Sequence, residues 1–118
     1  MRMDSLERVV KYLSDNLDGI RVAQDAPPNT KAIGDYVTVG RTGGRATMFL
    51  DMPRFTVDCH SSTGERAYAL AEHVGALLLS MSDADEMVSD VTINSFYRDD
   101  WADGYPCYSL HVPMVVNI

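Results

Sequence analysis

The sequence has few basic residues and no long apolar run, and each absence excludes a class of function. Its 118 residues hold 10 Lys and Arg against 17 Asp and Glu, a formal net charge of -7. This balance disfavours a protein that grips nucleic acid by neutralising phosphates. The longest apolar run, "GALLLSM" (75–81), is far shorter than the roughly 20 residues that a membrane-spanning helix needs. We therefore expect no sequence-specific nucleic-acid binding and no membrane insertion.

Cysteine is scarce, and the start of the chain, "MRMDSLERVV", lacks the apolar core of a signal peptide. We expect a protein made and folded in the cytosol. The two cysteines fall out of phase with each other. The two-residue repeat of a strand places Cys59 on the same face as the apolar residues around it. It places Cys107 on the face opposite the apolar set that begins with Tyr108 and Leu110. Thiols on opposite faces of one sheet are too far apart to bridge, so we predict two free cysteines.

What the sequence does contain is typical of one globular domain spanning 1–118. Apolar residues make up 46% and charged residues 23% of the chain. Helical periodicity predicts two amphipathic helices, over 4–18 and 63–81. A capping pattern precedes each of them, "DSLE" (4–7) and "STGE" (62–65), with Ser62 as the expected N-cap of the second helix.

The second helix has the stronger pattern. Small residues recur on it at four-residue intervals, which allows a helix to lie close against a sheet: Ala67, Ala71 and Gly75. We expect its larger apolar residues to be buried in the core: Leu70, Val74 and Leu77.

Five segments have the alternation or the residue types of strands: 20–24, 36–41, 54–60, 88–97 and 107–116. The resulting order, α-β-β-β-α-β-β, predicts an α+β fold with a mixed or antiparallel sheet of about five strands and two helices on one face. Pro113 lacks an amide hydrogen, so we expect the last strand to lie at an edge or to be bulged there.

A polar connection joins the strands 36–41 and 54–60. We expect the glycines of "RTGGR" to make the sharp reversal of a hairpin arm, with "ATMFLD" (46–51) extending it as further strand. The arm's candidate partner-binding residues are Arg41, Thr42, Gly43, Gly44 and Arg45. The two arginines would meet an anionic partner surface, and the alternative is a solvated tip. The stretch lacks the lysine and hydroxyl residue of a phosphate-binding loop.

No set of residues forms a convincing catalytic or metal-binding pattern. His60, His111 and Asp58 fall on the polar face of their strands, but without zinc-ligand spacing, so we favour solvated histidines. His60 follows Cys59 directly and therefore points to the opposite face, so it is not placed to act as the base of a cysteine nucleophile. We expect no catalytic residue, no cofactor and no metal.

Acidic residues are spread over loops and strand ends in the last third of the chain. They lack the strict spacing of a calcium-binding loop, and we expect most to be solvated. They are Asp83, Asp85, Glu86, Asp90, Asp99, Asp100 and Asp103.

The order of these pieces resembles a known family. The N-terminal helix, a proline-bearing loop, "DYVTVGRTGGR", "DMPRFTVDCHS" and the alanine-rich "STGERAYALAEHVGALLLSM" resemble the tail-terminator (tail completion) proteins of long-tailed bacteriophages. The likeness covers nearly the whole chain. It lies in the order and general composition of the segments and not in an invariant residue. It implies a sheet backed by two helices and a ring, typically of six subunits, that caps the tail tube, ends its polymerisation and joins the head connector. It implies no catalysis.

This resemblance implies a place in the virion, at the tail and neck, after assembly in the host cytoplasm. The partners would be further copies of the chain, the tail tube protein and the head-tail connector protein. The arm (41–45) would dock on a neighbouring subunit or on the ring below. Carboxylates of the loops 83–86 and 99–103 would face the channel through which the genome passes, since like charges oppose contact with DNA within roughly 8 Å at physiological salt.

Two other functions stay open. One is a different neck or connector protein of a phage. The other is a small dimeric α+β enzyme or ligand-binding module that uses the polar face of its sheet. The size of the oligomer distinguishes a ring from a dimer.

Overall fold

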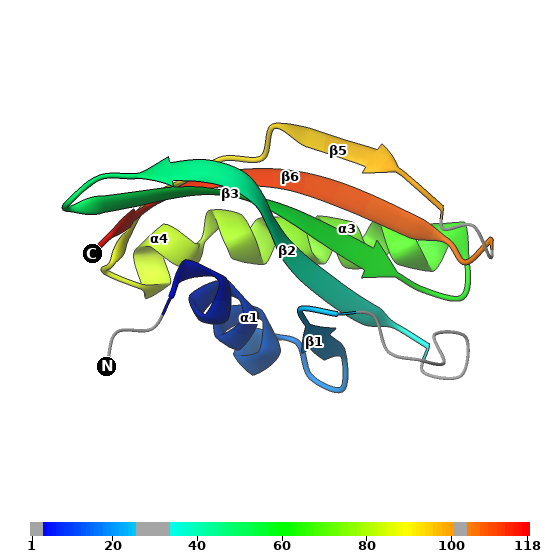
Figure 1. Ribbon diagram of the computed structural model, residues 1–118. Coiled ribbons are helices and arrows are strands. Elements are labelled where there is room, and N and C mark those ends of the chain that lie inside the picture. Colours follow the sequence, from blue (N-terminus) through cyan, green and yellow to red (C-terminus); the bar gives the residue numbers. More distant parts are fainter. Residues whose placement is uncertain (1–3, 26–33, 101–103) are drawn as a thin grey trace.

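A curled mixed sheet carries its helices on one face in the computed structural model, which describes residues 4–25, 34–100 and 104–118 (Figure 1). The predicted α+β class is confirmed. In chain order the elements are α1 (Ser5–Asn16), β1 (Arg21–Ala23), β2 (Tyr36–Ala46), β3 (Leu50–His60), α3 (Gly64–Leu79), α4 (Met81–Ala84), β4 (Val88–Val91), β5 (Ser95–Arg98) and β6 (Cys107–Asn117). Within these ranges, no helix combines the length and the apolar character needed to cross a membrane.

The six strands run in the order β1-β2-β3-β6-β4, with β5 also paired to β6. Only the β1–β2 pair is parallel, and the other pairs are antiparallel. Strands β4 and β5 follow each other along the same edge of β6, from Val88 opposite Val116 to Arg98 opposite Tyr108. The strand predicted over 88–97 is therefore present, but interrupted at 92–94.

Pro113 explains this interruption. It lies in β6, which is central in the sheet, so the edge alternative for this strand is wrong. The alternative of an irregularity is in line with the pairing, which shifts by one residue between Val91 opposite Met114 and Ser95 opposite His111. The carbonyl of Pro113 accepts a hydrogen bond from Thr92 N at 3.1 Å, in the break between β4 and β5. In a strand, the amide and carbonyl of one residue point the same way, so the missing amide hydrogen faces this irregular stretch.

Both predicted helices form, with one change of cap. Asp4 accepts a hydrogen bond from Glu7 N at 2.8 Å and starts α1 as expected. Thr63, and not Ser62, caps α3 by accepting from Arg66 N at 3.2 Å. Ser and Thr cap helices by the same chemistry, and the fold selects the residue whose backbone is extended directly before the first turn.

The core lies between the helices and the sheet. Helix α1 packs on β1, β2 and β3, while α3 packs on β3 and β6. The three small residues of α3 are buried as predicted: Ala67, Ala71 and Gly75. A Cβ atom at Gly75 would lie 3.3 Å from Ile93 Cδ1, so the small residue permits this close approach.

Leu70 and Val74 are buried in the core as predicted, but Leu77 is only half-buried. Its neighbour Leu78 is fully buried instead. The carbonyl of Leu77 accepts a hydrogen bond from the Tyr12 hydroxyl at 2.7 Å, which ties α3 to α1.

The opposite face of the sheet is also buried at one end. His60 is fully buried, so the prediction of a solvated histidine is wrong at this position, whereas His111 is exposed as expected. The His60 ring stacks on Tyr36 with centroids 4.3 Å apart, and Tyr105 lies beyond it. The segment before β6 folds back over this end, held by a hydrogen bond from the Tyr105 hydroxyl to Gly34 O at 2.8 Å.

The two cysteines lie on opposite faces of the sheet, as their phase predicts. Cys59 pairs with Tyr108 across β3 and β6, and Cys107 pairs with His60 one step along. Both are free and buried. Burial raises the pKa of the Cys107 thiol to about 12 and also raises that of Cys59.

We predict that neither thiol reacts readily in the folded protein. With a pKa of about 12, only about one Cys107 in 10,000 is a thiolate at pH 8, and the thiolate is the reactive form. A chromogenic thiol reagent should therefore titrate two thiols per chain in denaturant without reductant, and far more slowly under native conditions. A denatured count near zero in monomeric protein would contradict the strand phases.

We also predict that Leu78→Ala lowers the free energy of unfolding by about 2–5 kcal/mol, because it leaves a cavity under α3. Leu79→Ala is the matched control, since Leu79 is 51% exposed, and it should change stability by less than about 0.5 kcal/mol. Chemical denaturation of the two variants measures both values. Equal effects would show that α3 is rotated relative to the sheet.

Candidate functional site

The hairpin formed by β2 and β3 is longer than the sequence predicts, and its turn lies elsewhere. Both strands have 11 residues, and they are joined by residues 47–49 at one end of the molecule (Figure 1). The expected bend at Gly43 and Gly44 is wrong, because both residues lie in β2 and pair with residues of β3. The expectation that 46–51 extends the arm as strand is confirmed at its two ends, where Ala46 pairs with Asp51.

The strand has a bulge at Thr42, directly before the two glycines, and not a turn. The register of β2 against β3 shifts between Arg41 and Gly43. Gly44 has a φ of 109°, and a Cβ atom there would lie 2.3 Å from Met52 O. Glycine is therefore required by backbone conformation and by the close approach of the opposite strand. The bulge lets the chain continue as a ribbon past the glycines.

Arg41 is bound within its own hairpin. Its guanidinium donates two hydrogen bonds to Asp51, each 2.8 Å long. Asp51 also accepts from Ser5 Oγ at 2.6 Å, which connects the hairpin to the first residue of α1. The hydrogen bonds from Arg41 hold the pKa of Asp51 below its ordinary value, although burial acts in the other direction. The charge expected to meet a partner at this position is thus neutralised inside the chain.

The other members of the predicted arm lie along the outer part of the ribbon. Thr42 and Arg45 are exposed, and Thr42 Oγ1 donates to Arg54 O at 3.4 Å. The Arg54 side chain crosses Gly43 so closely that a Cβ atom there would lie 2.7 Å from its guanidinium. Arg45 and Arg54 thus present the basic charge of this ribbon.

The tip of the hairpin is apolar, which the sequence analysis missed. Met48 is 82% and Phe49 is 70% exposed. Thr47 Oγ1 accepts from the amides of Phe49 and Leu50, at 3.3 and 3.1 Å, and Ile118 N donates to Phe49 O at 2.9 Å. The backbone of the tip is therefore held in place while its two large side chains face solvent.

The structure does not bring the two acidic loops together. Residues 83–86 comprise the end of α4 and the turn after it, at the hairpin-tip end, whereas residues 99 and 100 follow β5 at the far end (Figure 1). Asp83 and Glu86 are exposed, and Asp99 is exposed as well. Asp103 lies outside the described residues.

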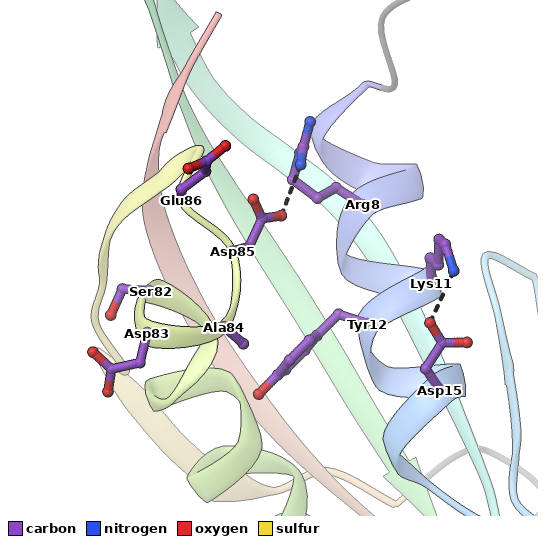
Figure 2. A pocket seen from close by; sticks show the side chains of 9 residues that line it. All are labelled: Arg8, Lys11, Tyr12, Asp15, Ser82, Asp83, Ala84, Asp85 and Glu86. Atoms are coloured by element: carbon purple, nitrogen blue, oxygen red, sulfur yellow. Dashed lines mark hydrogen bonds and ion pairs between the residues drawn. The ribbon is translucent and has the colours of Figure 1, made fainter.

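Two of the predicted carboxylates are paired. Asp85 forms an ion pair with Arg8 at 2.7 Å, across an open groove between α1 and α4 (Figure 2). Asp100 pairs with Arg98 at 3.0 Å and also accepts from Cys107 N. The charges best placed to act on a second molecule are therefore Asp83, Glu86 and Asp99.

Several of the residues that line the groove of Figure 2 serve to join the helices to one another. Tyr12 projects from α1 toward α3 and α4, and burial together with nearby Asp83 raises its pKa. The Lys11–Asp15 ion pair, 2.9 Å long, lies within α1 itself. Among the described residues, no group of three or more His, Cys, Asp and Glu side chains is placed to hold a metal ion.

Comparison with known protein families finds no matching family model, and comparison with curated proteins finds no match to this chain. The candidate site is accordingly defined by the geometry of the hairpin itself. Its main features are the anchored base at Asp51, the basic outer ribbon and the apolar tip.

We predict that Asp51→Asn lowers the free energy of unfolding at pH 7 by about 1–3 kcal/mol, because it leaves Arg41 with a neutral partner. The native pKa of Asp51 is depressed. Its stabilisation is thus complete above the ordinary carboxyl pKa near ~3.9 and is lost as the pH falls through the native value.

The difference between Asp51→Asn and the unmodified protein should therefore stay constant from pH 7 to 5 and shrink in more acid solution. Denaturation curves measured across this range provide the test. Asp15→Asn, at the exposed pair with Lys11, should change stability by less than about 0.5 kcal/mol. A difference for Asp51→Asn that grows on acidification would contradict the depressed pKa.

Proposed function

We propose that this protein is a structural component of a phage virion, which forms a ring on the end of the tail tube. The ring ends polymerisation of the tube and presents a surface to the head-tail connector. Two observations support this proposal. The order of sequence segments resembles the tail-terminator proteins, and the observed fold, a mixed sheet with two long helices on one face, is of the kind that this resemblance implies.

The observation that carries the proposal is the hairpin tip. Two adjacent large apolar side chains, Met48 and Phe49, face solvent at the end of a ribbon whose base is anchored to α1. Exposed apolar side chains that cluster in this way mark protein–protein contacts. Because the backbone of the tip is already ordered, little conformational entropy is lost when it binds. A docking element in an assembly needs these two properties.

Charge supports the same role. The chain carries a formal net charge of -7, so a ring of its copies would be strongly acidic. Subunits that stand with their long axis along the channel would bring the exposed carboxylates Asp83 and Glu86 to one end of it and Asp99 to the other. Such a lumen would let DNA pass without binding it.

The nearest alternative is another neck or connector protein of a phage, which would share a ring-forming, acidic character. A small dimeric enzyme or ligand-binding module is the alternative of a different class. Electron-microscope class averages of the purified protein distinguish them, since a ring with a central hole favours the first two and a dimer favours the third. Addition of the protein to polymerising tail tube protein then separates a terminator, which limits tube length, from a connector, which does not.

We predict that Arg45→Glu folds normally but impairs assembly of functional tails. Arg45 is exposed on the ribbon, so reversal of its charge costs little stability. Arg41→Glu would instead break the pair with Asp51 and lower the stability of the fold itself. Arg21→Glu is the matched control, because Arg21 is an exposed strand residue outside the hairpin.

Thermal melting should give similar midpoints for the Arg45 and Arg21 variants. Complementation of a phage that lacks this protein then compares the yield of complete tails. Equal yields for the two variants would show that Arg45 is a solvated strand residue with no role in docking.

A further inference from the structure

An apolar groove runs along the outward side of α3, where the helix passes the break between β4 and β5. Its walls are formed by Tyr68, Gly75, Ala76, Leu79, Ile93 and Phe96. Three of these side chains are well exposed, with Leu79 at 51%, Tyr68 at 44% and Phe96 at 37%. Together with Ile93 they line an exposed, mainly apolar surface beside α3.

The groove owes its position to features already described. Pro113 interrupts the edge of the sheet between β4 and β5, and Ile93 emerges at this interruption. Because Gly75 and Ala76 have little or no side chain, the surface of α3 is recessed at this turn. Tyr68 and Phe96 pack edge to face with ring centroids 5.4 Å apart, and so close one end of the groove.

The hairpin tip of the same chain is the apolar feature that we match to this groove. The hairpin tip presents Met48 and Phe49, a flexible and a flat apolar side chain, on an ordered turn. Tip and groove are both exposed in the isolated chain, so neither is covered by the other within one molecule. A second copy of the chain would supply a groove for the tip and a tip for the groove.

The charges of the hairpin and the groove favour a second copy of the chain as the occupant of the groove. Residues 41–54 contain three arginines and one aspartate in a chain whose formal net charge is -7. The ion pair of Arg41 with Asp51 leaves Arg45 and Arg54 as the net charge of the hairpin. The one ionised side chain that lines the groove is Glu72, which is exposed. The basic hairpin thus places a cation opposite the one carboxylate of an otherwise apolar groove.

We infer that the hairpin tip of one subunit inserts into the α3 groove of the next, with Met48 and Phe49 between Leu79 and Phe96 and with Arg45 facing Glu72. This inference rests on the proposed ring-forming function, because it names the surfaces that join neighbouring subunits. The two surfaces differ, so the contact is head-to-tail, and such contacts close into a ring when the rotation per subunit allows. One tip buries little area, so each contact is weak and ring closure adds to its strength.

Two variants disable the two surfaces separately. Phe49→Asp removes the apolar tip and leaves the groove intact, whereas Leu79→Glu charges the groove and leaves the tip intact. Both residues are exposed, so thermal melting should show a folded monomer in each case. Tyr97→Ser is the matched control, because Tyr97 is 39% exposed and lies outside both surfaces.

Sedimentation equilibrium of each purified protein measures self-association. The unmodified chain and Tyr97→Ser should associate alike, and each disabling variant should associate at least about 30-fold more weakly, as expected for loss of a central apolar contact. An equimolar mixture of Phe49→Asp and Leu79→Glu should form a one-to-one dimer and no larger species. Only one intact tip and one intact groove are then available to meet.

Charge reversal gives an independent measurement of the same contact. Arg45→Glu and Glu72→Arg should each weaken association, and the double variant, in which the pair is restored in the opposite sense, should associate better than either single variant. A double variant no better than either single variant would show that the two charges do not face each other.

The inference is overturned if either disabling variant associates like the unmodified chain, if their mixture stays monomeric even at concentrations high enough for a single unclosed contact to form, or if the unmodified chain is monomeric throughout. A tip that binds only the tail tube protein would leave self-association unchanged in Phe49→Asp. The proposed function is judged separately by tail-tube length. A chain that caps tubes while both variants still form rings would keep that function and remove this contact.

Discussion

Strand β3 is hydrogen-bonded on both sides along most of its length, and the rest of the molecule depends on this double pairing. It runs antiparallel to β2 from His60 to Asp51 and to β6 from His60 to Leu50. These three strands of 11 residues make the molecule long in one direction, 42 Å against 24 Å in the others. They carry the hairpin tip to one end and the loop before β6 to the other, so the two ends present different chemistry.

The base of the hairpin is held by one polar contact with three members. Arg41 binds Asp51 with both arms of its guanidinium, and Ser5 binds the same carboxylate from α1. The arrangement satisfies a carboxylate that is largely buried, and it orients the ribbon relative to the helices. It also neutralises the charge of Arg41, which leaves Arg45 and Arg54 as the net basic charge of the hairpin.

The two faces of the sheet are buried for different reasons. The helix side holds an apolar core, while part of the other side is covered by stacked rings of Tyr36, His60 and Tyr105. Near this end Asp58 accepts from Ser109 Oγ at 2.6 Å, and burial raises the pKa of that carboxyl. The hairpin tip and the groove of α3 stay exposed, and these are the two surfaces that our proposals assign to assembly.

Sequence periodicity was sufficient for the elements of secondary structure and for the faces of their residues. The helices, the strand alternation around Cys59 and the opposite phase of Cys107 are local properties, since they follow from the 3.6-residue and two-residue repeats of the backbone. The same local rules failed at Gly43 and Gly44. A glycine pair suits a turn and a bulge equally well, and the choice depends on where the opposite strand pairs.

The sequence by itself therefore determined an acidic α+β domain with two free thiols and a hairpin that joins the segments 36–41 and 54–60. Only the tertiary structure decided that Arg41 is neutralised, that His60 is buried and that Met48 and Phe49 form the tip. The first two depend on residues distant in the chain, Ser5 for Arg41 and Asp51, and Tyr36 and Tyr105 for His60, and the third on the register in which β2 pairs with β3. Local pattern does not encode such contacts, because they form only when the strands have paired and the loops have closed over them.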